Sequence, residues 1–97
     1  MGDVVYLNDL FDIYGELLTD KQQLYFKDYY FDNLSYGEIA EKYNISRNAS
    51  FKQLKNAVDK LNELENILHI YKNNKIIREL IVKEKDENIK KELEKLI

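Results

Sequence analysis

Five side chains near the middle of the chain have residue types and a spacing that are typical of a helix that contacts DNA bases and phosphates. They recur at intervals of one, three and four residues, so a helix would carry all of them on one face: Arg47, Asn48, Phe51, Lys52 and Lys55. An arginine can hydrogen-bond guanine with two nitrogens, an asparagine can pair with the edge of adenine, and lysines bind phosphates. Phe51 can contact a thymine methyl or pack against a neighbouring helix. The set predicts a DNA-reading face, and a solvated helix face without a ligand is the alternative.

Such side chains need a braced helix to carry them, and residues 35–61 have the pattern of a helix-turn-helix. Ser35 and Glu38 match a capping box that begins the first helix, and Ser46 is a cap for the second. Asn44 occupies the turn, where asparagine tolerates a left-handed backbone better than most residues. The residues predicted to pack the two helices together are Ile39, Ala40, Tyr43, Ile45 and Leu54.

Two further helices are expected before this motif. Apolar residues at spacings of three and four predict the first from about Leu7 to Leu18. A capping box formed by Thr19 and Gln22 begins the second, which runs to about Phe31. The aromatic stripe of that second helix is expected to lie in the core.

Composition favours an all-α fold. The chain has 97 residues, no proline, three glycines and 34% charged residues. The helix capped by Ser46 has no breaker before Asn73 and is expected to reach about residue 72. Residues 1–72 are therefore expected to form the helix-turn-helix domain, and residues 73–97 a C-terminal helical extension of one helix, or of two with a break near Asp86.

The second half of the chain carries more apolar surface than the first three helices can cover. The long helix has a heptad-like seam, and a second apolar face and an apolar tail follow it: Leu54, Leu61, Leu64, Leu68, Tyr71, then Ile76, Ile77, Leu80, Ile81, then Ile89, Leu93, Leu96, Ile97. Exposed in a monomer, this surface would exceed what soluble chains usually show. A homodimer built on the C-terminal half is expected, and an intrachain hairpin turning at residues 73–74 is the alternative.

Charge is distributed unevenly along the chain. The whole chain has a net charge of -3. Residues 1–45 hold nine acids against three lysines, a net of -6, and residues 46–97 hold twelve bases against nine acids, a net of +3. Between residues 46 and 62 four bases face Asp59 alone. The positive field is thus local to the predicted reading helix and small, so DNA binding would be salt-sensitive and would benefit from a dimer.

Other kinds of chemistry have little support in the sequence. There are no cysteines, and the single histidine, His69, has no second metal-ligating partner nearby. No glycine-rich phosphate loop or nucleophile–base set is present. No catalytic residue, metal site, cofactor or small-molecule substrate is therefore predicted, and the chain is expected not to be an enzyme. No apolar run has the length of a signal peptide or membrane span, so a cytoplasmic protein without a membrane partner is expected.

At this point a resemblance supplements the pattern. Residues 7–72 resemble the bacterial YlxM-type family through "LFDIYGELLTDKQQLYFKDYYFDNLSYGEIAEKYNISRNA" and the later "LHIY", and the resemblance fades beyond about Asn74. The segments "LLTDKQ" and "YGEIAEKYNISR" are its more specific parts. That family is similar to region 4 of sigma factors, which reads promoter DNA, and its genes tend to neighbour those of the signal recognition particle. The resemblance implies a sigma-region-4-like helix-turn-helix and a role in that pathway.

Three positions depart from the family's pattern. Ser50 stands where an apolar residue, commonly valine, anchors the reading helix, Lys52 where an acid is common, and Asn56 where a base is frequent. We expect Ser50 to be buried against the preceding helix with its hydroxyl bonded to the carbonyl of Ser46. On that basis Ser50→Val is expected to stabilise the domain by about 1 kcal/mol.

Two functions are consistent with these observations. The first is a DNA-binding regulatory protein of the sigma-region-4-like type, acting in the signal recognition particle pathway. The alternative is an adaptor that binds the protein or the RNA of that particle without reading a DNA sequence, through its acidic first half or its long helix. A dimeric structural domain with a vestigial motif is a further alternative.

Overall fold

The computed structural model describes residues 2–97 and confirms the all-α prediction, since every regular element in this part of the chain is a helix. Its elements, in order along the chain, are α1 (Val4–Tyr14), the 3-10 helix η1 (Gly15–Leu17), α2 (Asp20–Tyr30), α3 (Tyr36–Tyr43), α4 (Arg47–Leu68), α5 (Ile70–Lys83) and α6 (Glu87–Glu94). Met1, the first residue of the predicted 1–72 domain, lies outside the described residues.

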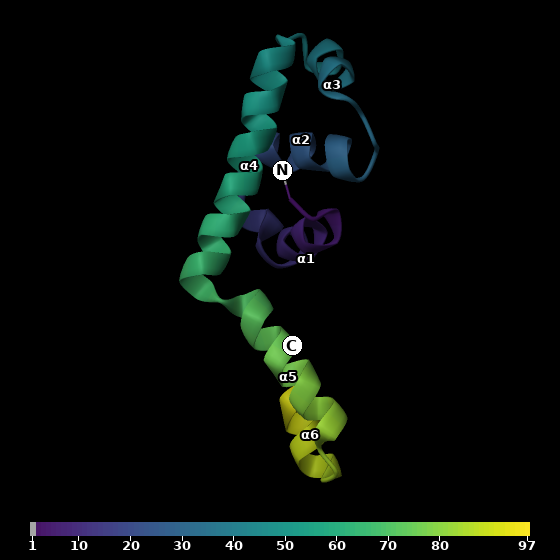
Figure 1. Cartoon of the computed structure of the whole chain (residues 1–97), viewed down its shortest axis with the longest axis vertical. Helices are drawn as coiled ribbons and strands as arrows, with labels where there is room; N and C mark the ends of the chain where they lie inside the picture. Colours follow the sequence, from purple (N-terminus) through teal and green to yellow (C-terminus); the bar gives the residue numbers. More distant parts are fainter. Residues whose placement is uncertain (1) are drawn as a thin grey trace.

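The helix α4 is the spine of an elongated molecule. Helices α1, α2 and α3 all pack along one side of it, and α5 and α6 form a hairpin beyond its end (Figure 1). The molecule measures 56 × 24 × 21 Å, and its radius of gyration is 17.0 Å. A compact chain of this length would have a radius of gyration of roughly 12–13 Å. The excess comes from the α5–α6 hairpin, residues 70–97, which is called the arm below.

The main core forms where α1 and α2 meet α4. Its buried members are Leu7, Leu10, Tyr14, Leu18, Phe26, Ala57, Val58 and Leu61. The aromatic stripe of α2 contributes as predicted, because Tyr25 and Phe26 are buried and the Phe26 ring stacks on Phe11 with centroids 4.4 Å apart. Phe31, at the end of the stripe, is exposed instead.

The predicted caps of α2, α3 and α4 are confirmed. The Thr19 and Ser35 hydroxyls each accept a hydrogen bond from the backbone N–H three residues on, and the side chains of Gln22 and Glu38 accept from the cap N–H groups in return. The Ser46 hydroxyl accepts from the Ala49 N–H. These reciprocal bonds satisfy donors that every helix start leaves unpaired, so each helix begins where its cap stands.

The bounds predicted for the first helix are wrong at both ends. It begins at Val4, because the Asp3 carboxylate accepts hydrogen bonds from the N–H groups of Val5 and Tyr6 and so caps it one turn early. It ends at Tyr14, and the chain continues as the 3-10 turn η1.

The long helix also ends earlier than predicted. It stops at Leu68 rather than near residue 72, because His69 takes the left-handed conformation with φ 56°. Asn73 and Asn74, the predicted turn, lie inside α5. After α4, the chain turns back between α5 and α6, where the Asp86 carboxylate caps α6, and this agrees with the break near that residue.

A buried carboxylate makes this early break stable. The first N–H groups of α5 have no cap of their own, and they reach into the core instead. Glu65 accepts hydrogen bonds from the N–H groups of Tyr71 at 3.0 Å and Lys72 at 3.1 Å, while the Tyr14 hydroxyl accepts from the Ile70 N–H at 3.1 Å. The same hydroxyl donates to Glu65 at 2.6 Å. This network joins α1, α4 and α5, and it fixes the arm to the spine.

Candidate nucleic-acid interface

The first turns of α4 form the surface to which the sequence assigned DNA contacts. All five predicted contact residues are exposed: Arg47, Asn48, Phe51, Lys52 and Lys55. Their spacing along one regular helix places them on one face, at the end of α4 remote from the arm (Figure 1). The prediction that they share an exposed face is therefore confirmed, and their contact with DNA stays a prediction.

The helix that carries this face is braced from behind by α3. Ile39 and Leu54 are fully buried and Ala40 is nearly so, as the helix-turn-helix pattern requires. Tyr43 and Ile45, the other two predicted packing residues, are half-buried at the edge of the motif. The five thus have the surroundings expected of bracing residues, although two of them remain partly open to water.

Ser50 ties the two helices of the motif together through its hydroxyl. It is buried as predicted, but the partner predicted for its hydroxyl is wrong. The oxygen lies 2.8 Å from the carbonyl oxygen of Tyr36 in α3 and 2.7 Å from that of Arg47, rather than bonding to Ser46. The bond to Tyr36 is possible because α3 crosses α4 here at hydroxyl distance. Ser50 therefore makes a polar contact between the two helices. An apolar side chain at this position was instead expected to stabilise the domain.

The turn between the helices has the geometry predicted for it. Asn44 takes φ 54° and ψ 49°, and its N–H donates to the carbonyls at the end of α3. After this turn, the Ser46 hydroxyl accepts from Ala49, while the N–H groups of Arg47 and Asn48 donate no hydrogen bond within residues 2–97. These two donors sit at the positive end of α4, which is a favourable place for a phosphate.

Two of the five exposed residues have partners that limit their freedom. The Phe51 ring meets the Tyr36 ring edge-on at 5.3 Å between centroids, and 37% of Phe51 remains exposed. Packing on α3 was one of its two expected roles, and the exposed remainder is still available to a ligand. The Lys55 ammonium lies 2.8 Å from the Asp59 carboxylate, one turn along the helix. The single acid of this segment therefore neutralises one of its bases.

Behind the motif lies a charged residue that the sequence analysis missed. The Asp28 carboxylate is buried, and it accepts hydrogen bonds from the Lys42 ammonium at 2.9 Å and the Tyr43 hydroxyl at 2.5 Å. Burial raises the pKa of the Tyr43 hydroxyl, and its bond to the carboxylate raises it further. The bond to Asp28 also raises the pKa of Lys42. Asp28 thus joins α2 to α3 through hydrogen bonds. Its position one turn after the core residue Tyr25 was the feature of the sequence that could have indicated its burial.

Glu65 is the second buried acid that the sequence analysis missed. It lies one turn after Leu61 on the apolar seam of α4. An acid at such a core position was the feature of the sequence that could have indicated a buried carboxylate. Neither acid belongs to a metal site, since within residues 2–97 no group of three or more His, Asp or Glu side chains is arranged to hold a metal ion. None of the helices in this part of the chain combines the length and apolarity needed to cross a membrane.

Comparison with known proteins places the whole chain in one group. A family model described as "Putative helix-turn-helix protein, YlxM / p13 like" matches residues 1–97, so the similarity extends past Asn74, where the resemblance was expected to fade. That description names a helix-turn-helix and no enzymatic activity.

Individual relatives support the same grouping. A UPF0122 protein of Fusobacterium nucleatum is 36% identical over 97 residues, which is 100% of this chain and 94% of the relative. One from Lactococcus lactis subsp. cremoris is 42% identical over 81 residues, covering 79% of this chain and 73% of that protein. One from Lacticaseibacillus casei is 45% identical over 67 residues, or 69% of this chain and only 59% of the relative's length.

Proposed function

Since the chain belongs to the YlxM / p13-like helix-turn-helix family, we propose that it is a cytoplasmic DNA-binding regulatory protein that inserts the first turns of α4 into the major groove. The observation that carries the proposal is the exposed face of α4 defined by Arg47, Asn48, Phe51, Lys52 and Lys55, which is braced by the buried side of α3. In this proposal residues 1–72 serve as the reading domain and residues 73–97 as a C-terminal extension.

Each residue of the face has a role in the proposal that follows from its chemistry. Arg47 and Asn48 lie at the N-terminal tip of α4, where a recognition helix contacts base edges. Arginine suits guanine, asparagine suits adenine, and the exposed edge of Phe51 suits a thymine methyl. Lys52 binds a phosphate, and the free N–H groups at the start of α4 add a second phosphate contact.

The charge of the site sets the expected strength of binding. Lys55 is held by Asp59, so few free cations remain on this face. Each phosphate contact releases counterions, so a protein with few such contacts binds weakly, and its binding remains salt-sensitive with a slope set by the small number of contacts. We therefore expect weak binding by one copy and stronger binding by two copies on adjacent half-sites, separated by one or more turns of about 34 Å.

Binding to genomic DNA fragments, measured by fluorescence anisotropy over a salt series, tests the proposal. Arg47→Ala is expected to weaken binding roughly five- to 150-fold, the effect of losing about 1–3 kcal/mol at a base contact. Lys52→Ala is expected to reduce the salt slope by about 0.9, the value for one phosphate. Lys85→Ala, in the turn between α5 and α6, removes the same charge away from the face and serves as the control. Equal affinities for all three variants and the parent chain would reject the reading face.

An adaptor of the signal recognition particle pathway is the second candidate, and the charge of the first half favours it. Residues 1–45 carry a net charge of -6, and α1 and η1 expose Asp12, Glu16 and the apolar Leu17. A surface of this kind suits a basic protein partner rather than a nucleic acid. The particle's RNA and protein, titrated in parallel with DNA, separate the candidates. Binding to either that survives Arg47→Ala, with no DNA binding, supports the adaptor.

A further inference from the structure

The arm carries an apolar surface that nothing within residues 2–97 covers. None of the residues of α5 and α6 is fully buried. We propose that this surface docks the same surface of a second copy of the chain, so that two α5–α6 hairpins close into a four-helix bundle. The proposal does not depend on DNA binding.

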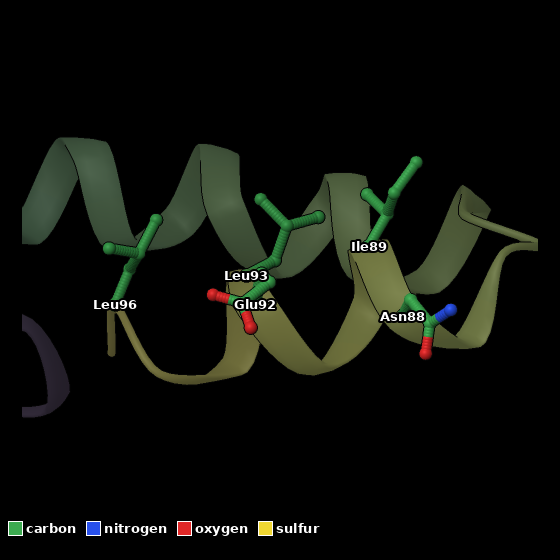
Figure 2. Close-up of a pocket in the computed structure, with 5 residues that line it drawn as sticks. All are labelled: Asn88, Ile89, Glu92, Leu93 and Leu96. Atoms are coloured by element: carbon green, nitrogen blue, oxygen red, sulfur yellow. The ribbon is translucent and has the colours of Figure 1, made fainter.

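Apolar residues that remain open to water form one stripe on α5 and one on α6. On α5, Ile76 and Leu80 lie one turn apart, and about half of each side chain is open to water. On α6, Ile89, Leu93 and Leu96 recur at spacings of four and three, and Ile89 is 48% and Leu96 64% exposed. Figure 2 shows these three projecting from one side of α6, over the α5 ribbon. They line a groove of about 390 Å³ together with Asn88 and Glu92.

The hairpin cannot cover these stripes by itself. A stable domain buries apolar faces between two packed layers, and α5 and α6 form one layer. They contact each other, and α5 touches α1, but Ile77, Ile81 and Leu93 become only half-buried in this way. The arm, residues 70–97, is also smaller than the roughly 40 residues below which a unit needs added stabilisation such as oligomerisation. A further helical layer is required to complete its core.

The charges on the arm make a second copy a suitable layer. Four bases, Lys72, Lys75, Arg78 and Lys83, lie on α5 against Glu79 alone, whereas α6 holds three acids against two lysines. In a two-fold arrangement the same patch meets itself, and α6 of each copy can lie on α5 of the other. The basic rim of α5 then faces the acidic rim of α6 twice. A strongly acidic or strongly basic partner would match only one of the two helices.

The geometry keeps the reading face free in such a dimer. The arm leaves the spine at His69, while Arg47 and Asn48 stand at the opposite end of α4 (Figure 1). The 22 residues of α4 separate the two ends by roughly 33 Å at about 1.5 Å per residue. The hydrogen bonds of Tyr14 and Glu65 hold the arm at a fixed angle to α4, so the dimer would set a defined distance between its two reading helices.

Light scattering on the purified full chain at micromolar concentration tests this proposal. The parent chain is expected to have twice the 11.6 kDa mass of one copy. Leu80→Glu and Ile89→Glu, which place a charge in the stripes, are expected to give the mass of one copy. Val82→Glu is the matched control, because Val82 is 83% exposed and lies about 200° around α5 from Leu80, on the opposite side. This control is expected to remain a dimer.

Circular dichroism distinguishes loss of the dimer from loss of the fold. Where a glutamate variant loses helical signal, Leu80→Ala and Ile89→Ala replace it, and the dimer dissociation constant is expected to rise at least tenfold by sedimentation. A parent mass near 11.6 kDa, including one accompanied by binding to lipid vesicles or to another protein, overturns the proposal. So does a dimer that none of these variants weakens. Arg47→Ala is expected to keep the dimer mass, so failure of the DNA proposal and failure of this one give different results.

Discussion

The Tyr14 hydroxyl holds the joint between α4 and α5 together with Glu65, and removing this hydroxyl is expected to destabilise the protein. Tyr14→Phe deletes one oxygen and leaves the buried ring in place. That oxygen donates to the Glu65 carboxylate at 2.6 Å and accepts from the Ile70 N–H at 3.1 Å. After the change, the carboxylate keeps two donors, both backbone N–H groups, instead of three, and the Ile70 N–H loses its acceptor.

The expected cost follows from the charge on the acceptor. A hydrogen bond to a charged group contributes about 1.5–3 kcal/mol to stability, and one between neutral groups about 1 kcal/mol. Because α5 can partly relax toward water at Ile70, we expect a total loss of about 2 kcal/mol. For a domain of this size that corresponds to a fall in Tm of roughly 8–16 °C.

Thermal unfolding followed by circular dichroism measures this loss against a matched control. Tyr25 is also buried, and its hydroxyl makes no side-chain hydrogen bond within the described residues, so Tyr25→Phe is expected to change stability by less than about 0.5 kcal/mol. Equal Tm values for Tyr14→Phe and Tyr25→Phe would refute the reasoning.

The same joint makes stability depend on pH. Burial raises the pKa of the Glu65 carboxyl, but the hydrogen bonds from Tyr14, Tyr71 and Lys72 together outweigh burial, and the net pKa is lowered. The folded protein therefore holds the Glu65 proton less tightly than the unfolded chain does. The stabilisation is complete above the unfolded value of about 4.3 and is lost as pH falls through the lower folded value. The difference in Tm between the parent and Glu65→Gln is thus expected to shrink from pH 7 to pH 3, and a constant difference would contradict this account.

Three further predictions concern the reading motif. Asp59→Asn is expected to free Lys55, and so to tighten DNA binding severalfold and steepen its salt slope, measured by anisotropy; unchanged affinity counts against a role for Lys55. Ser50→Val, first expected to stabilise, is now expected to destabilise by about 1–3 kcal/mol, since a methyl group cannot approach the Tyr36 carbonyl oxygen as closely as the 2.8 Å of the hydroxyl. An equal or higher Tm for that variant would show that the helices separate without cost. Asn44→Ala is expected to lose about 1 kcal/mol at φ 54° while Asn44→Gly is nearly neutral, so equal urea midpoints for the two would reject a left-handed turn.

Local interactions let much of the fold and the candidate site be predicted from the sequence. The starts of α2, α3 and α4 follow from caps whose partners lie three residues away, and the turn at Asn44 follows from that residue's own backbone preference. The exposed face around Arg47 follows from helical periodicity, because the side of α4 that carries Leu54 is buried. Each of these features is decided within one or two turns of helix, and local sequence patterns report such short distances.

Tertiary structure alone decided where the spine ends, how α3 is tied to α4 and where two acids are buried. No glycine or proline marks the break at His69. The break depends on the Tyr14 hydroxyl, which accepts a hydrogen bond from the N–H of Ile70, 56 residues later in the sequence. Ser50 bonds to Tyr36 because α3 crosses α4 there, and Asp28 is buried because Lys42 and Tyr43 come from another helix to meet it. A buried polar group is tolerated only when it has a hydrogen-bond partner. Partners that are distant in sequence come within hydrogen-bond distance only in the folded structure.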